Sequence, residues 1–133
     1  MEHSGTVIYV VDDDESIRRA MSRLMKSAGL KVQTFSSARS FLESRSVGTK
    51  GCIIADLRMP CLGGLELATE LKLRGCLLPI IIVTAFDTEE ARIAARSAEV
   101  VGFFRKPVDA QALLDAVYWA SLGCGENTAK ETN

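Results

Sequence analysis

An aspartate at the end of an apolar run is the residue of this chain best placed for chemistry. Residues 52–55 (Cys-Ile-Ile-Ala) lead directly into Asp56, and Pro60 follows four residues later. A short apolar run rich in β-branched residues predicts a strand buried on both faces. In open α/β sheets, ligands bind outside the carboxyl ends of the strands, where Asp56 would emerge. We therefore interpret Asp56 as the acceptor of a phosphoryl group.

A second apolar run, residues 6–11, also ends in acidic residues, at positions 12–15. If the two strands are neighbours, Asp12, Asp13 and Asp56 converge, and three carboxylates in one pocket repel one another unless a cation lies between them. Hard oxygen ligands with access to solvent suit Mg²⁺. The last two acids of the stretch instead fit the N-terminus of a helix, where the helix dipole favours negative charge.

A hydroxyl and an ammonium group follow the two later strand-like runs. Thr84 ends the run 80–84, and Lys106 comes shortly after the run 100–104. Taken singly, Thr84 could be a helix-capping residue and Lys106 a solvated surface lysine. Because both fall at the same rim of the sheet as the acids, we expect them to hold the oxygens of a phosphoryl group.

These residues must be positioned by strands that alternate with helices. The strand-like runs are residues 6–11, 31–35, 52–56, 80–84 and 100–104. Between them, apolar residues recur at helical spacing, for example from Ile17 to Ala28 before Gly29. The pattern predicts an α/β flavodoxin-like (βα)5 fold, a three-layer sandwich around a five-stranded parallel sheet in the order 2-1-3-4-5. That order places the ends of the first and third strands side by side.

Composition sets limits on the class of protein. The chain has 133 residues, 47% of them hydrophobic, 25% charged, and a net charge of −1, which predicts one globular domain without an electrostatic surface for nucleic acid or membrane. No apolar stretch predicts a membrane span or a signal peptide. The four cysteines form no C-x-x-C pair and there is one histidine, so we expect no zinc site, reduced thiols and a cytoplasmic location.

At its candidate site residues the chain resembles the CheY-like receiver domain of two-component response regulators. The matching stretches are Val10-Val11-Asp12-Asp13, Asp56-Leu57-Arg58-Met59-Pro60, Val83-Thr84-Ala85 and Lys106-Pro107. The resemblance covers residues 6–122 and leaves 123–133 as a polar tail that we expect to be disordered. It fits either a stand-alone receiver or one cut from a larger protein.

The resemblance implies a role for each acidic residue. Asp56 would take the phosphoryl group from a sensor histidine kinase or a histidine phosphotransfer protein. Asp13 and Asp56 would bind Mg²⁺ directly, together with the backbone carbonyl of Arg58, and Asp12 would act through water. The chain would then be a phosphoacceptor that self-phosphorylates and self-dephosphorylates with Mg²⁺, and not an enzyme in the ordinary sense.

The resemblance also implies a switch. Thr84 would bind a phosphoryl oxygen and shift toward it, Lys106 would pair with the same group, and the bond from Lys106 to Pro107 would be cis. Phe103 stands at the position of the family's switch aromatic residue, although it could also be an ordinary core phenylalanine. Phosphorylation would thus change the face formed by the fourth helix, fifth strand and fifth helix. That face would control a downstream protein partner, with the chain as a monomer or a phosphorylation-dependent dimer, without direct contact to nucleic acid or membrane.

Four residues near the site or the switch call for separate expectations. The family commonly has glycine where Cys61 stands and a small pair where Glu99-Val100 stands. Glu99 is a poor residue for a helix end, so we expect the fourth helix to fray or to end differently. Arg58 and Phe86 are large residues two positions beyond Asp56 and Thr84, and we expect them to slow self-dephosphorylation.

Three alternatives belong to other classes. A Mg²⁺-dependent phosphatase or phosphotransferase would use Asp56 as a transient nucleophile, but such enzymes usually have a second acid where Arg58 stands. An interaction module that is never phosphorylated would not need the complete set of site residues. A flavin-binding flavodoxin would need a phosphate-binding loop rich in Ser, Thr and Gly after the first strand. The sequence leaves the role of Trp119, the only tryptophan, undecided: the side chain could belong to the core or to a surface that binds a partner.

Overall fold

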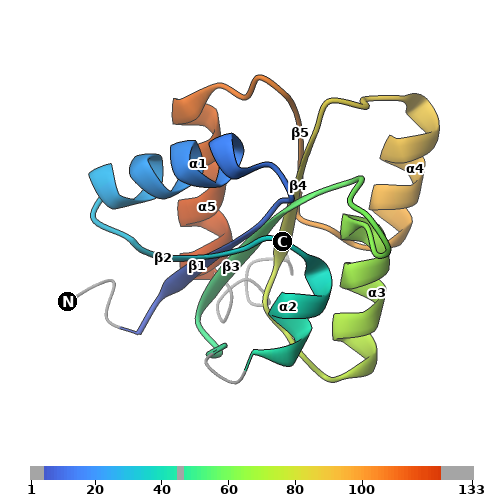
Figure 1. Ribbon diagram of the computed structural model, residues 1–133, viewed down its shortest axis with the longest axis horizontal. Coiled ribbons are helices and arrows are strands. Elements are labelled where there is room, and N and C mark those ends of the chain that lie inside the picture. The colour runs from blue at the N-terminus through green and yellow to red at the C-terminus, as the bar shows by residue number, and fades with distance from the viewer. Residues whose placement is uncertain (1–4, 45–46, 124–133) are drawn as a thin grey trace.

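The computed structural model describes residues 5–44 and 47–123, which form one parallel sheet with helices on both sides (Figure 1). The strands are β1 (Val7–Val11), β2 (Lys31–Phe35), β3 (Gly51–Asp56), β4 (Ile80–Thr84) and β5 (Gly102–Arg105). The helices are α1 (Glu15–Ser27), α2 (Ala38–Glu43), α3 (Gly64–Leu73), α4 (Glu89–Ser97) and α5 (Ala110–Gly123). All neighbouring strands are parallel and their order is β2-β1-β3-β4-β5, so the predicted topology is confirmed.

The two faces of the sheet bury alternate residues of each strand, because successive side chains of a strand point to opposite sides. Toward α2 and α3 the sheet presents Tyr9, Ile53 and Ile82, which pack with Phe41 and Leu67. Toward α1 and α5 it presents Ile8, Ile54 and Ile81, which pack with Met25 and Val117. Each such side chain contributes about 1.5–3 kcal/mol on full burial, and together they hold the strand ends in place.

The fifth strand begins later than the sequence suggested. We predicted residues 100–104, and the strand covers Gly102–Arg105. The reason is that the Val100 N–H donates to the carbonyl of Ala95, at the end of α4, and so is not available to the sheet. The first hydrogen bond from this segment to β4 comes from Val101, just before β5 begins. Its N–H donates to the carbonyl of Ile80.

Helix α4 ends in the same way as two other helices. At α1 and α3 a glycine with positive φ follows the helix, Gly29 (φ 81°) and Gly75 (φ 80°), and two backbone hydrogen bonds close the last turn. Glu99 takes this place after α4, with φ 61° and the same pair of bonds. The expectation that α4 ends differently is therefore wrong: the backbone accepts Glu99 in the left-handed region, and the Glu99 carboxylate pairs with Lys72 of α3.

Helix α4 buries few of its side chains. Of its nine residues only Ala95 is buried, and its neighbour Ala94 is exposed. Ile93 of this helix is also exposed. The helix is therefore held by a small number of contacts, so each contact of Arg92 has a large share in positioning it.

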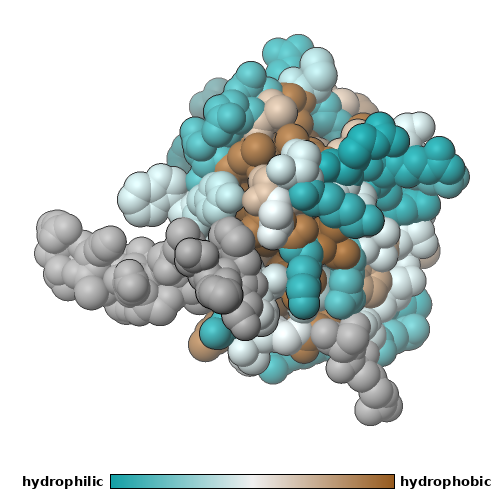
Figure 2. Space-filling model, turned by 90° about the vertical axis from the view of Figure 1, so that its left-hand side faces the viewer, coloured by the Kyte–Doolittle hydropathy of each residue, from teal (hydrophilic) through white to brown (hydrophobic). Residues whose placement is uncertain are grey.

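The surface carries several large apolar side chains. Trp119 is 72% exposed, so it is not a core residue. It lies with Leu77 and Val101 around a hollow of about 500 Å³ at the amino end of β4. The side of the molecule that lies to the left in Figure 1 shows hydrophobic residues in the middle with hydrophilic side chains around them (Figure 2). Among the described residues, no helix combines the length and the hydropathy that crossing a membrane requires.

Candidate functional site at the carboxyl edge of the sheet

Four strands bring the predicted site residues to one edge of the sheet. In the register of β1 and β3, Val11 pairs with Ala55, so the next residues, Asp12 and Asp56, emerge side by side. Thr84 is the last residue of β4, beside Arg105 of β5, and Lys106 follows directly. Strand pairing therefore sets the mutual positions of these side chains.

Three carboxylates form the centre of the site. One oxygen each of Asp12, Asp13 and Asp56 lies within 4.8 Å of the others. Asp12 is buried, at 3% exposure, Asp56 is half-buried, and Asp13 is exposed to solvent. The set therefore offers hard oxygen ligands on a site that is open on one side, the arrangement that suits a hydrated Mg²⁺ ion.

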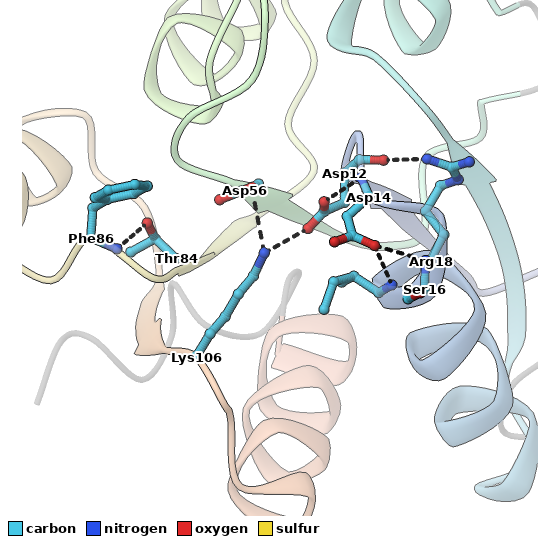
Figure 3. A network of polar contacts seen from close by, with 9 residues as sticks. Asp12, Asp14, Ser16, Arg18, Asp56, Thr84, Phe86 and Lys106 are labelled. Atoms are coloured by element: carbon cyan, nitrogen blue, oxygen red, sulfur yellow. Dashed lines mark hydrogen bonds and ion pairs between the residues drawn. The ribbon is translucent and has the colours of Figure 1, made fainter.

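The ammonium of Lys106 lies between two of these carboxylates. Its Nζ is 3.0 Å from Asp12 Oδ2 and 3.4 Å from Asp56 Oδ2 (Figure 3). Three negative charges against one positive charge leave the site with a formal charge of −2 (−3 + 1). The donors present therefore fit a divalent cation, which would balance this charge.

Burial and charge act on the titration of the site in opposite directions. Burial raises the pKa of Asp56 above its usual value, the charge of Lys106 lowers it, and the charge of Asp12 raises it again. For Lys106, burial alone would lower the pKa, but the hydrogen bond to Asp12 and the charges of Asp12 and Asp56 raise it overall. Lys106 is thus a permanent positive charge beside a carboxylate that is costly to ionise.

The loop after β1 is held by its own hydrogen bonds. The Asp14 N–H donates to Asp12 Oδ1 at 2.9 Å, and Nη1 of Arg18 donates to the Asp12 carbonyl at 2.8 Å. The Asp14 carboxylate accepts from the N–H groups of Ser16 and Ile17 and so caps α1, in agreement with the predicted helix N-terminus. Asp12 is therefore fixed in position from both sides (Figure 3).

Thr84 lies at the rim of the site and is fully buried. Its Oγ1 accepts a hydrogen bond of 2.9 Å from the N–H of Phe86, two residues further along the loop (Figure 3). The side chain thus holds the start of the β4–α4 loop. This contact could not be predicted from the residue type alone.

Arg58 and Phe86 stack on each other. The guanidinium carbon of Arg58 lies 4.2 Å from the centre of the Phe86 ring, and both residues are exposed. Because Arg58 follows Asp56 by two residues and Phe86 follows Thr84 by two, the stack joins the β3–α3 and β4–α4 loops. Phe103, in contrast, is not part of the acidic cluster: it lies on β5, on the face of the sheet that also carries Ile82.

Two backbone features of the β3–α3 loop were not assigned a role from sequence. A Cβ atom on Gly64 would lie 2.6 Å from the Asp56 carbonyl, so only glycine lets α3 start this close to β3. Cys61 has φ 71°, in the left-handed region that favours glycine. The signal for the first was the Gly-Gly pair at 63–64. On the other side of the site, the Lys106–Pro107 peptide bond is cis.

Comparisons with known proteins agree on one family. A family model described as the response regulator receiver domain matches residues 8–118. The chain is 38% identical over 117 residues to response regulator protein TodT of Pseudomonas putida, covering 88% of this chain and 52% of that protein. It is 37% identical over 116 residues to transcriptional regulatory protein FixJ of Azorhizobium caulinodans, covering 87% and 54%.

A solved structure is similar over nearly the whole chain. The full-length FixJ of B. japonicum superimposes with a TM-score of 0.85 at 31% identity, covering 96% of this chain and 63% of that one. The chain spans about half the length of the curated relatives it matches. The likeness therefore concerns one domain of these longer regulators.

Proposed function

The chain belongs to the response regulator receiver family, a group of phosphoacceptor signalling domains of two-component systems, and on this premise we propose that Asp56 is the residue that accepts the phosphoryl group. The observation that carries the proposal is the placement of the Lys106 ammonium between Asp12 and Asp56 in a site of net negative charge. The carboxylates can bind the metal ion, and the ammonium can bind the oxygens of the phosphoryl group.

We propose that Mg²⁺ binds to Asp13, Asp56 and the backbone carbonyl of Arg58, with Asp12 contributing through water. When bound, the ion would neutralise charge on the transferring phosphoryl oxygens. Everything else would come from side chains that are already in place. Asp56 supplies the nucleophile, Lys106 supplies a fixed positive charge, and Thr84 supplies a hydroxyl donor.

The proposed reaction is an in-line transfer. A carboxylate oxygen of Asp56 attacks phosphorus, the P–N bond of a phosphohistidine on the partner breaks, and the released imidazole nitrogen takes up a proton from solvent. The product is an acyl phosphate on Asp56. Such a transfer needs positioning and charge stabilisation more than covalent help from the protein, and the fixed strand ends supply the positioning.

The new charge would be read out through Thr84. The aspartyl phosphate adds about two negative charges and three strong hydrogen-bond acceptors. The Thr84 hydroxyl would turn toward these oxygens and give up its bond to the Phe86 N–H. We infer that the face of α4, β5 and α5 changes as a result and that a downstream protein reads this change.

Response regulators interact with histidine kinases and with downstream targets, and we propose both kinds of partner for this chain. The donor would be a sensor histidine kinase or a histidine phosphotransfer protein. Because small phosphoryl donors need no docking surface, we also expect the chain to phosphorylate itself from acetyl phosphate. We place its action in the cytoplasm, where such kinases present their phosphohistidine.

The test is the intact mass of the protein after incubation with acetyl phosphate and Mg²⁺. We expect a gain of one phosphoryl group in the wild type and in Asp115→Asn, a matched change of an exposed aspartate on α5. We expect no gain in Asp56→Asn. A gain that persists in Asp56→Asn would overturn the assignment of the acceptor, and no gain in any variant despite Mg²⁺ binding would favour an interaction module that is not phosphorylated.

A further inference from the structure

Arg92 of α4 joins two parts of the molecule that are distant in sequence. Its guanidinium makes two hydrogen bonds to the Asp87 carboxylate, Nε to Oδ1 at 2.6 Å and Nη2 to Oδ2 at 2.9 Å. The same guanidinium lies over the ring of Phe103, with its carbon atom 5.1 Å from the ring centre. Arg92 thus connects the loop before α4 to the middle of β5.

The loop that carries Asp87 is also held by Thr84. Phe86, the residue before Asp87, donates its N–H to Thr84 Oγ1 at 2.9 Å. A continuous series of contacts therefore runs from the Thr84 hydroxyl through the loop to Asp87, then to Arg92 and the Phe103 ring. The links are the hydrogen bond from Phe86 to Thr84, the peptide bond from Phe86 to Asp87, the ion pair of Asp87 with Arg92 and the cation–π contact of Arg92 with Phe103.

Strand register places the two ends of this series on the same face of the sheet. Thr84 pairs with Arg105 and Ile82 pairs with Phe103, so Thr84 and Phe103 are diagonal neighbours on β4 and β5. Side chains two residues apart on a strand point to the same side. The ring therefore lies close to space that Thr84 would vacate if its side chain moved.

The contacts of Arg92 matter because little else holds α4. Only Ala95 of this helix is buried. The pair with Asp87 is bidentate, which is the geometry that fixes a guanidinium most firmly. Its hydrogen bond lowers the pKa of Asp87 and raises the pKa of Arg92, so both groups stay charged throughout the neutral range.

We propose that Arg92 is a positioning residue of the switch: held by Asp87, its guanidinium keeps the half-buried Phe103 ring in contact with α4 and releases the ring when Thr84 no longer binds the Phe86 N–H. The inference rests on the proposed function, since it assumes that Thr84 responds to a group on Asp56. It adds a residue of α4 that sets how easily the response reaches β5. Loss of Arg92 would therefore favour the released position before any phosphorylation.

The test follows the ring of Phe103 by NMR in protein labelled with ¹³C at the phenylalanine ε carbons, with the signal assigned through Phe103→Leu. The variants are Arg92→Gln, Arg92→Lys, Asp87→Asn and, as the matched control one turn further along α4, Arg96→Gln. Each is compared without a donor and with acetyl phosphate and Mg²⁺.

We expect Arg92→Gln to move the Phe103 signal part of the way toward its position in the phosphorylated wild type. The ratio of the two ring populations should change about two- to fivefold, the size expected for the loss of one exposed cation–π contact. Asp87→Asn should act in the same direction and add little to Arg92→Gln. Arg92→Lys should move the Phe103 signal less than Arg92→Gln does, because lysine keeps the positive charge of arginine but not its planar fork.

A second comparison needs no phosphoryl donor and so separates the two proposals. Thr84→Val removes the acceptor for the Phe86 N–H, and it should move the Phe103 signal in the wild-type background but much less when combined with Arg92→Gln. Equal shifts in both backgrounds, or the same spectrum for Arg92→Gln and Arg96→Gln, would overturn the inference. Failure of Asp56 to accept a phosphoryl group would instead overturn the proposed function and leave this comparison decisive for Arg92.

Discussion

The stack of Arg58 on Phe86 has a consequence for the lifetime of an aspartyl phosphate. The two side chains lie two residues beyond Asp56 and Thr84, and their contact at 4.2 Å spans the loops on either side of the site. Hydrolysis requires water to approach phosphorus in line with the bond that breaks. A stacked pair of large side chains at this rim should restrict that approach.

We therefore predict that Arg58→Ala combined with Phe86→Ala speeds self-dephosphorylation. An increase of about tenfold corresponds to a barrier lower by about 1.4 kcal/mol, a plausible effect of opening one path for water. The measurement is the loss of phosphorylated mass with time after the donor is removed. Arg96→Ala, on the outer face of α4, serves as the control, and an unchanged rate in the double variant would remove the argument.

A second residue-scale prediction concerns Asp56 and pH. Burial raises the pKa of this carboxyl in the folded chain. Between the usual pKa of an aspartate and the raised value, the folded chain binds a proton that the unfolded chain has lost, so stability falls as pH rises through this window. The loss persists at neutral pH.

Asp56→Asn removes that loss, and we predict a variant more stable than the wild type at pH 7 without divalent cations. The difference should shrink on acidification and vanish below about pH 3, where the aspartate is protonated in both states. Urea unfolding at several pH values measures it, with Asp115→Asn as the exposed control. A difference that stays constant with pH would contradict the assignment to ionisation.

The sequence could identify the acids and the lysine because strand patterns place them without knowledge of side-chain contacts. Asp12 and Asp56 follow apolar runs, and the sheet order then brings them together. Arg92 could not be identified in the same way, because its contact with Phe103 depends on how α4 packs beside β5. The left-handed backbone of Cys61 could not be predicted from cysteine itself; its signal was the glycine that the family commonly has at this position.

At the scale of the element, the three similar helix ends allow a direct comparison. Gly29, Gly75 and Glu99 occupy the same position with φ 81°, 80° and 61°. An L-residue in this region costs about 1–2 kcal/mol relative to its preferred backbone, whereas glycine adopts it freely. The α4 end is thus formed at a cost that the other two helices avoid.

We predict that Glu99→Gly raises the thermal midpoint by about 2–4 °C, the shift that about 1 kcal/mol produces in a domain of this size. The ion pair with Lys72 is exposed, so its loss offsets little of the gain. Gly75→Ala is the converse change and should lower the midpoint. Calorimetry of both variants decides the point, and a lower midpoint for Glu99→Gly would show that the contact with Lys72 outweighs the backbone.

Element boundaries show where local patterns stop being informative. The run 31–35 was predicted with its observed limits, because polar residues and glycine bound it. The limits of β5 were missed, because the end of α4 uses the Val100 N–H. The fold could be predicted from the alternation of strands and helices, while the limits of an element depend on which neighbour takes its backbone groups.

At the scale of the whole molecule, the three carboxylates at the acidic edge destabilise the folded chain, and a bound cation would remove this effect. Three carboxylates within 4.8 Å repel one another in the folded chain but separate on unfolding. A ligand that binds only the folded state stabilises it by RT ln(1 + [L]/Kd), about 1.4 kcal/mol at ten times the Kd.

We therefore predict that Mg²⁺ at about ten times its Kd raises the thermal midpoint by about 3–6 °C and that EDTA reverses the shift. Asp13→Asn should reduce this response, since it removes an exposed carboxylate of the cluster without disturbing the core. Asp109→Asn, at the start of α5, is the control. An undiminished response in Asp13→Asn would place the cation elsewhere.

The position of Trp119 determines what intrinsic fluorescence can report about this protein. Its indole is the only one in the chain, it is 72% exposed, and it lies beside the hollow at the amino end of β4, the opposite end of that strand from Thr84. Intrinsic emission should therefore be red-shifted and open to collisional quenchers in the isolated domain. A blue shift or loss of quenching would signal that another surface has covered the hollow beside Trp119.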